Sequence, residues 1–260
     1  MEDKFTHCPV CKEPEQMELK SRVHGGRIIV PRQCACIRAM HEAEEKRVKI
    51  QEHENTVSRN RGICFKQRQL EKCTFENDNG KTPTMSFAKK YVDGWNEVKE
   101  KNAGLLLWGG IGSGKTYMAA CIANALLEQE KRVLMTDFTT ISNISLYDIS
   151  EFIRSLETYA LLIIDDLGAE RNSEFALQNV YDVINNRNNS GKPLLITTNL
   201  QLEEIQKEVS LAKKRIYDRI LGMCVPVHME GNSKRKAVAG KKEAFLTQLF
   251  EVNAGGEMHE

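Results

Sequence analysis

The chain has 260 residues, which is enough for one full α/β core with a small appendage. Its 37 basic and 36 acidic residues leave a net charge of +1, so any contact with nucleic acid or membrane must be local. The charged N-terminus lacks a signal core, and apolar runs such as residues 160–164 are far below the ~20 residues that cross a bilayer. We expect a cytoplasmic protein without membrane association.

The first part of the chain, residues 1–36, is predicted to be a zinc-binding module. Four of the eight cysteines gather here: Cys8, Cys11, Cys34 and Cys36. Residues 18–33 predict a hairpin that brings the two pairs together. Without an export signal, the cluster indicates a tetrahedral, structural Zn²⁺ site rather than disulfides. The second pair is spaced by one residue instead of two, so His7, His24 or His41 remains an alternative to one sulfur.

The second part, residues 37–73, is predicted to be a charged helical linker. Residues 37–61 are almost entirely charged residues and good helix formers, with too few apolar residues to bury a face. We expect an exposed connecting helix, and the alternative is a solvated charge run that binds nothing. The third part, residues 74–260, has the texture of an ordinary globular domain.

Strands and helices are predicted to alternate in this third part. Apolar runs predict strands at residues 104–108, 132–136, 160–164, 193–198 and 225–229. Helical periodicity predicts helices at residues 116–129, 149–157 and 173–189. Continuous apolar strands separated by helices indicate a parallel sheet that is covered on both faces. We therefore expect an α/β fold with five parallel strands between helices.

A glycine-rich loop, GGIGSGKT at residues 109–116, lies between the first strand and the following helix. It fits the pattern G-x-x-x-x-G-K-[ST], whose glycines let backbone N–H groups face a phosphate at a helix N-terminus. Lys115 is expected to reach the β- and γ-phosphates, and the Thr116 hydroxyl to coordinate Mg²⁺. We assign nucleotide contact to nine residues: Gly109, Gly110, Ile111, Gly112, Ser113, Gly114, Lys115, Thr116 and Tyr117.

Two adjacent acids follow the third strand in LLIIDDLG, residues 161–168. Asp165 is predicted to hold Mg²⁺ together with Thr116, through a water. Asp166 can orient or deprotonate an attacking water, so the second acid favours hydrolysis over transfer to another substrate. The alternative for Asp166 is a turn or N-cap carboxylate, and Asp is one methylene shorter than the Glu that many motors place here.

Further polar residues follow the fourth strand. Asn199 ends LLITTN and can hold the attacking water or the γ-phosphate if its strand lies beside that of Asp165. Arg215 and Arg219, four residues apart in RIYDRI, share one helical face. An arginine supplied by a neighbouring subunit can stabilise charge in the transition state, and the alternative is pairing with surface acids.

Together these motifs resemble the AAA+ ATPases, and more narrowly the DnaC/DnaI-type replicative helicase loaders and the related IstB-type transposition helpers. The resemblance covers residues 74–236 and includes TFEN (74–77) and GNSKR (231–235). It implies ATP hydrolysis, weak and stimulated by DNA or a partner. It also implies Asn199 as sensor 1, Arg219 as an arginine finger acting in trans, and Arg235 as the sensor 2 arginine.

The resemblance further implies partners: a hexameric DnaB-type helicase, single-stranded DNA and further copies of the chain that meet at the ATP site. The N-terminal zinc module would dock on the helicase. The chain departs from the family pattern in having only about 30 residues after the fifth strand, so we expect a reduced or absent lid. Residues 137–159, which help to contact DNA in the family, carry a single basic residue, Arg154.

The leading hypothesis is therefore a helicase loader that uses ATP hydrolysis. A transposition helper and a nucleotide-switched adaptor with little hydrolysis are the alternatives. A small-molecule kinase is disfavoured by the pair of acids and by the lack of an evident acceptor lid.

Overall fold

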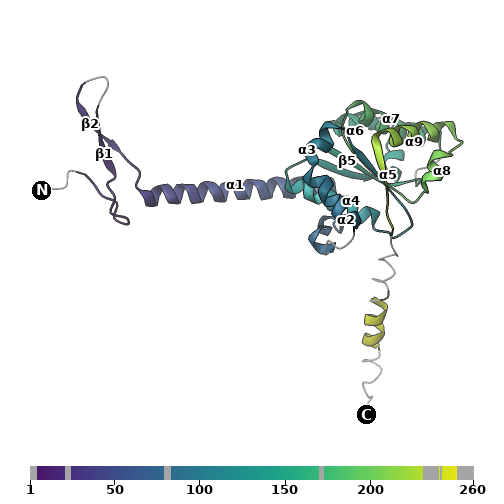
Figure 1. Ribbon diagram of the computed structural model, residues 1–260, viewed down its shortest axis with the longest axis horizontal. Coiled ribbons are helices and arrows are strands. Elements are labelled where there is room, and N and C mark those ends of the chain that lie inside the picture. Colours follow the sequence, from purple (N-terminus) through teal and green to yellow (C-terminus); the bar gives the residue numbers. More distant parts are fainter. Residues whose placement is uncertain are drawn as a thin grey trace, which may run out of the picture. The chain divides into compact units, whose positions relative to one another are not determined.

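The computed structural model describes residues 5–20, 25–78, 83–169, 173–230, 240 and 242–250 (Figure 1). The chain divides into two compact units, Met1–Thr56 and Val57–Glu260. The division falls inside one long helix, α1 (Ala35–Cys64), whereas the sequence predicted borders after residues 36 and 73. No helix in the described part of the chain is long and apolar enough to cross a membrane.

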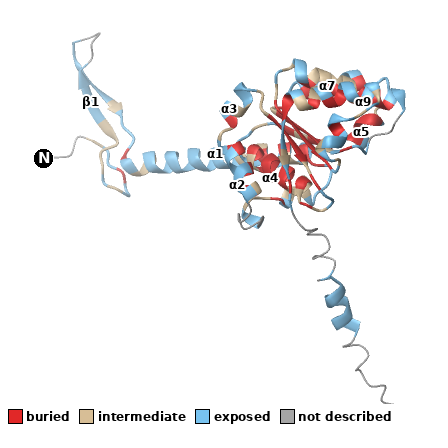
Figure 2. Ribbon diagram, turned by 45° about the vertical axis from the view of Figure 1, so that its right-hand side comes forward, coloured by how far each residue is buried: buried red, intermediate tan, exposed pale blue. Residues whose placement is uncertain are grey.

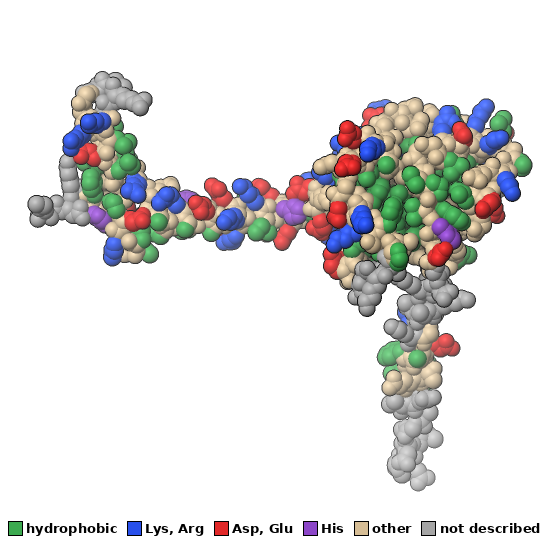
Figure 3. Space-filling model, in the orientation of Figure 1, with side chains coloured by type: hydrophobic (Ala, Val, Ile, Leu, Met, Phe, Trp, Pro, Cys, Tyr) green, Lys and Arg blue, Asp and Glu red, His purple; other side chains and the backbone are tan. Residues whose placement is uncertain are grey.

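The N-terminal unit consists of an antiparallel ribbon and most of α1. The ribbon pairs β1 (Gln16–Lys20) with β2 (Arg27–Pro31), so that Met17 lies opposite Val30 and Leu19 opposite Ile28. Residues opposite each other share a face, and these four apolar side chains therefore lie on one side of the ribbon. The part of α1 in this unit is exposed (Figure 2) and carries acidic and basic side chains along its length (Figure 3).

The C-terminal unit is built around a five-stranded parallel sheet, as predicted. Its strands are β3 (Gly104–Trp108), β4 (Val133–Asp137), β5 (Leu161–Leu167), β6 (Leu194–Thr198) and β7 (Cys224–His228). They lie in the order β4-β5-β6-β3-β7. The order places β6 between the strand that leads into the glycine loop and the strand that carries the two acids.

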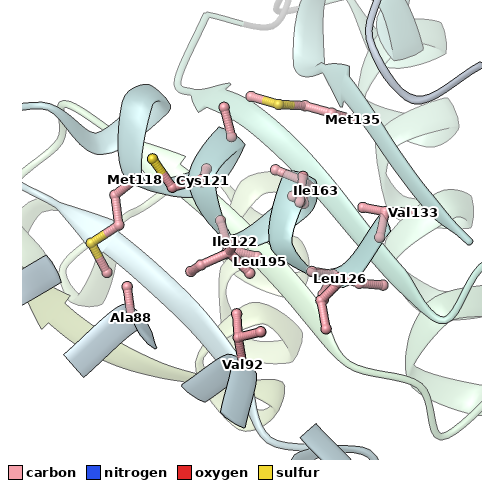
Figure 4. Packing of buried hydrophobic residues seen from close by; sticks show 14 of the residues in the cluster. Ala88, Val92, Met118, Cys121, Ile122, Leu126, Val133, Met135, Ile163 and Leu195 are labelled. Atoms are coloured by element: carbon pink, nitrogen blue, oxygen red, sulfur yellow. The ribbon is translucent and has the colours of Figure 1, made fainter. Parts of the chain in front are cut away.

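Helices cover both faces of this sheet. On one face pack α2 (Pro83–Asp93), α3 (Trp95–Glu100) and α4 (Lys115–Glu128), and Figure 4 shows α4 side chains such as Ile122 and Leu126 packed with strand residues including Val133 and Ile163. The other face is covered by α5 (Phe138–Ser142), α6 (Ile149–Leu156), α7 (Glu174–Asn189), α8 (Leu202–Gln206) and α9 (Leu211–Met223). Each fully buried Leu or Ile contributes about 1.5–3 kcal/mol.

A buried arginine holds the amino ends of two central strands. Arg187, at the end of α7, is fully buried and donates hydrogen bonds to the carbonyl oxygens of Leu156, Tyr159, Ala160 and Pro193. These residues precede β5 and β6. Burial lowers the pKa of Arg187 to about 10, so the guanidinium is still charged at neutral pH. Five hydrogen bonds to neutral carbonyls offset the cost of burying that charge.

After β7 the described residues contain one further helical stretch, residues 242–250, whose side chains are exposed. The sensor 2 candidate Arg235 lies outside the described residues, as does His24 in the N-terminal unit.

Candidate nucleotide-binding site and metal centre

The glycine loop turns tightly between β3 and α4. Gly109, Gly112 and Gly114 have φ angles of 142°, 82° and 94°, a region that side chains disfavour. A Cβ at Gly109 would also lie 2.5 Å from the carbonyl oxygen of Met229. Met229 follows β7, and its N–H donates to the carbonyl of Trp108 at 2.8 Å. Glycine at 109 is therefore required both by its backbone conformation and by the approach of a second chain segment.

Lys115 begins α4 and folds back over the loop. It is 5% exposed, and its Nζ donates to the carbonyl oxygens of Gly109 (2.9 Å) and Gly110 (2.8 Å). The same Nζ donates to Asn199 Oδ1 at 2.8 Å. Because β6 lies beside β3 in the sheet, Asn199, which follows β6, comes close to Lys115, which follows the glycine loop after β3. The two candidates, 84 positions apart, therefore meet at the N-terminus of α4, where the helix adds positive potential.

The remaining loop candidates point in different directions. Ile111 is 74% exposed at the tip of the loop, whereas Ser113 is buried. The hydroxyl of Tyr117, one turn into α4, donates to the carbonyl of Thr74 at 3.1 Å. Tyr117 thereby joins the P-loop helix to the TFEN segment that precedes the core.

Asn124, two turns further along α4, extends this junction, and it was not predicted as a functional residue. Its side-chain amide is buried and donates to the carbonyl oxygens of Leu70 and Cys73, both at 2.9 Å. Its oxygen accepts from Arg61 Nε at 3.0 Å. The only signal in the sequence was a polar residue within an otherwise apolar helix.

Thr116 and Asp165 lie together, in an arrangement that suits Mg²⁺. The Thr116 hydroxyl is 3.1 Å from both carboxylate oxygens of Asp165. Burial raises the pKa of Asp165, the hydroxyls of Thr197 and Thr116 act in the opposite direction, and the neighbouring charge of Asp166 adds to the rise. Hydroxyl and carboxylate oxygens are the ligand types that Mg²⁺ prefers, so these residues fit the ion.

The two acids lie within β5 and not after it, which differs from the predicted strand end at residue 164. The pairing of β5 with β6 shifts register between Ile164 and Leu167, so the acids form a bulge. Asp166 has a φ of 57°, a left-handed conformation that Asp tolerates better than most residues. Asp165 is half-buried and Asp166 is exposed. An apolar run followed by acids could not reveal that the strand continues past them.

Thr197 of β6, which also was not predicted as a site residue, contacts both acids. It is fully buried, and its hydroxyl donates to Asp165 Oδ1 while accepting the N–H of Asp166 at 3.0 Å. A threonine in the apolar run LLITT was the signal available in the sequence.

Arg219 on α9 is held by residues of α7. Its Nε donates to Asn185 Oδ1 at 3.1 Å, and its Nη2 donates to the hydroxyl of Tyr181 at 2.8 Å. The guanidinium also lies 4.6 Å from the centre of the Tyr181 ring. These partners are neutral, in contrast to the surface acids of the alternative hypothesis. Arg215 lines a cavity of about 370 Å³ that is also lined by residues of α7.

The four N-terminal cysteines form a candidate metal centre. The sulfurs of Cys8, Cys11, Cys34 and Cys36 all lie within 4.8 Å of one another. Backbone N–H groups of Cys11 and Val10 lower the pKa of Cys8 to about 6, whereas the neighbouring sulfurs raise the pKa of Cys36. Zn–S bonds of about 2.3 Å place the sulfurs of a tetrahedral site roughly 3.7 Å apart, so the cluster fits Zn²⁺.

The alternative histidine ligands are not part of this cluster as far as the chain is described. His7 pairs with Pro14 in an isolated bridge, and His41 lies on the exposed part of α1. The other cysteines, Cys64, Cys73, Cys121 and Cys224, are buried in the C-terminal unit, and no disulfide joins any of the described cysteines.

Comparison with known proteins places this geometry in a family. Residues 44–242 match the family described as IstB-like ATP binding protein. Over 183 residues the chain is 29% identical to the replicative helicase loader DnaC of Escherichia coli (strain K12), which covers 65% of this chain and 72% of that protein.

Two further similarities concern DnaI. Over 248 residues the chain is 23% identical to the replicative helicase loader DnaI of Bacillus subtilis (strain 168), which covers 88% of this chain and 78% of that protein. A match of this extent reaches into the N-terminal unit. A crystal structure of DnaI has a TM-score of 0.54 at 25% identity, over 64% of this chain and 96% of that one.

Proposed function

The chain belongs to the IstB-like ATP-binding protein family, and we propose that it is an AAA+ ATPase that loads a hexameric, DnaB-type replicative helicase onto single-stranded DNA. The observation that carries the proposal is the presence of a P-loop site and a four-cysteine cluster in one chain. A relative named as a helicase loader matches over both units.

The nucleotide site would work through groups that the fold already brings together. Loop N–H groups and the start of α4 bind the phosphates of ATP, and Lys115 contacts the β- and γ-phosphates. Thr116 and Asp165 hold Mg²⁺, which neutralises charge on the phosphates. Asn199, bonded to Lys115, holds the attacking water or the γ-phosphate, and Asp166 orients or deprotonates that water.

Self-association would complete the site. Arg219 acts on the triphosphate of a neighbouring subunit, and Tyr181 and Asn185, its side-chain partners among the described residues, are neutral and do not cancel its positive charge. An arginine delivered in this way contributes about 10³–10⁵ in rate. Arg235 is proposed as the sensor 2 arginine on sequence grounds alone.

The N-terminal unit would bind the helicase. A module this small has little core, so Zn²⁺ held by the four cysteines would supply most of its folding energy. The apolar ribbon face of Met17, Leu19, Ile28 and Val30 favours a protein partner over a nucleic acid, because three of these side chains are 38–48% exposed.

Contact with single-stranded DNA would involve few charges. Between α5 and α6, Tyr147 is 95% exposed, and an exposed aromatic ring can stack on a base. Arg154 is the single basic residue among residues 137–159, so we expect binding to depend on stacking more than on phosphate contacts.

The decisive experiment is co-purification of the full chain with a purified hexameric DnaB-type helicase. We expect wild type and Arg219→Ala to retain the helicase, and Cys8→Ser to lose it. Retention by Cys8→Ser, or no binding by wild type, would contradict the loader proposal and favour the transposition helper.

A second experiment tests catalysis between subunits. ATPase activity should rise with single-stranded DNA, collapse in Arg219→Ala and in Asp166→Asn, and partly return when the two variants are mixed. Equal turnover in wild type and Asp166→Asn would instead support the nucleotide-switched adaptor. The short side chain of Asp166 is the observation that favours that second candidate.

A further inference from the structure

Thr197 joins the two acids of the candidate site through one oxygen atom. It lies on β6, is fully buried, and its Oγ1 contacts both Asp165 Oδ1 and the N–H of Asp166. A hydroxyl has a single proton. Because the Asp166 N–H can only donate, the proton of Thr197 is directed to the Asp165 carboxylate. The hydroxyl therefore has one defined orientation.

The bulge in β5 explains why a side chain is needed here. The register shift between Ile164 and Leu167 interrupts the ladder of backbone hydrogen bonds to β6 at the two acids. A backbone N–H left unpaired in this half-buried place would destabilise the fold. Thr197 accepts that N–H, and the next residue, Thr198, donates its hydroxyl to the Leu167 carbonyl at 2.8 Å. The two threonines thus add side-chain hydrogen bonds at the bulge and directly after it.

We propose that Thr197 is a positioning residue for both acids. It orients the Asp165 carboxylate toward the Thr116 hydroxyl, and it holds Asp166 in its left-handed, exposed conformation. This inference rests on the proposed function, because it assigns Asp165 to Mg²⁺ and Asp166 to water. The hydrogen bond from Thr197 restricts rotation of the Asp165 carboxylate, whose oxygens both lie 3.1 Å from Thr116 Oγ1. The bond to the Asp166 N–H stabilises its φ of 57°.

Thr198 offers a matched control within the same strand. It is equally buried, and its hydroxyl also bonds to β5, at the Leu167 carbonyl, but among the hydrogen bonds of the described residues it has none to either acid side chain or to the Asp166 N–H. Replacing either threonine by valine keeps the shape and removes one hydroxyl. If Thr197 only stabilised the sheet, the two substitutions would have the same consequences.

The test compares Thr197→Val, Thr197→Ser and Thr198→Val in the full chain. Binding of a fluorescent ATP analogue is measured at increasing Mg²⁺ and in EDTA, beside thermal unfolding and DNA-stimulated turnover. We expect Thr197→Val to raise the Mg²⁺ concentration for half-saturation and to lower kcat, each by about 10–100-fold, as loss of an outer-shell partner typically does. Binding in EDTA should not change, and serine should restore most of both losses.

Thr198→Val is expected to lower the unfolding temperature as much as Thr197→Val while leaving the Mg²⁺ dependence unaltered. Equal Mg²⁺ dependence in the two valine variants, or failure of serine to rescue, would overturn the inference. The Mg²⁺ titration needs no turnover and no helicase, so Thr197 is tested even if the loader function fails. A wild type that binds no nucleotide with Mg²⁺ would overturn both.

Discussion

Asp165 is held where its charge is costly. Burial raises the pKa of this carboxyl, so the folded chain retains the proton more tightly than the unfolded chain does. The free energy of unfolding therefore falls as pH rises from the unfolded pKa through the folded pKa, and the loss is complete once the folded carboxyl is ionised. At neutral pH this acid destabilises the fold, which is typical of a functional position.

We predict that Asp165→Asn raises the unfolding temperature of the nucleotide-free chain at neutral pH by a few degrees. The advantage should shrink as pH falls through the folded pKa of the acid, because wild type then becomes protonated. Added Mg²⁺ and ATP should stabilise wild type but not the variant. Thermal unfolding of both proteins across a pH series from neutral into the acid range provides the measurement. A variant that unfolds at a lower temperature at neutral pH would refute the argument.

At the scale of single residues, the sequence predicted the candidate site residues that belong to a short motif or that directly follow a strand. Lys115 and Asn199 meet as the strand order required, and Thr116 meets Asp165. Thr197 and Asn124 were not predicted, because a buried polar residue within an apolar run reveals its partner only once the neighbouring element is in place. Arg219 was correctly placed on a helix, but its contacts with α7 depend on packing that periodicity does not specify.

At the scale of elements, Arg187 secures the start of β5 and β6. We predict that Arg187→Met costs about 3 kcal/mol or more, since several buried carbonyls lose their donor. In a domain of this size that lowers the unfolding temperature by roughly 6–12 °C. Arg187→Lys should also destabilise, because an ammonium cannot reproduce the planar fork.

Thermal unfolding followed by circular dichroism checks this prediction, with Arg154→Met as the control. Arg154 is exposed on α6, and its replacement should shift the unfolding temperature by no more than a degree or two. Equal stability of Arg187→Met and Arg154→Met would show that the buried guanidinium contributes nothing.

The five strands and the helices α4, α6 and α7 were predicted from the apolar pattern, because most residues of β3, β4, β5 and β6 are buried. The end of β5 was not, since a bulge continues the strand through two acids. The ribbon was predicted from its position between two cysteine pairs. The pairing of Met17 with Val30 was needed to show that the apolar side chains of both strands lie on one face.

For the whole molecule, composition and packing divide the chain at different places. The predicted borders lie after residues 36 and 73, whereas the compact units separate at residue 56, inside α1. The physical reason is that Val57 and Asn60 are the first buried residues of that helix. The charged composition extends along α1 past residue 56, but burial begins at Val57, where the helix packs against the core of the C-terminal unit. The predicted borders remain predictions.

We predict that the metal supports the N-terminal unit alone. A strong chelator should release about one Zn²⁺ per chain, in line with one four-sulfur site. Limited proteolysis should then cleave the ribbon region, while residues 57–260 stay resistant and still bind ATP.

Cys11→Ser should reproduce the effect of the chelator, and His7→Ala should retain zinc. Metal content measured on the purified variants decides between the four-cysteine site and a site with a histidine ligand. Full zinc in Cys11→Ser, or its loss in His7→Ala, would contradict the four-sulfur assignment.

The junction at Asn124 has a mechanical consequence. Arg61, in the last turn of α1, donates to Asn124 and pairs with Glu128, and both partners belong to the helix that starts with Lys115. Side-chain hydrogen bonds thus join the last turn of α1 directly to α4. A change in the orientation of the final turn of α1 would therefore shift α4, whose first residue, Lys115, we propose to contact phosphate. A shift of α4 on nucleotide binding would act on the final turn of α1 in return.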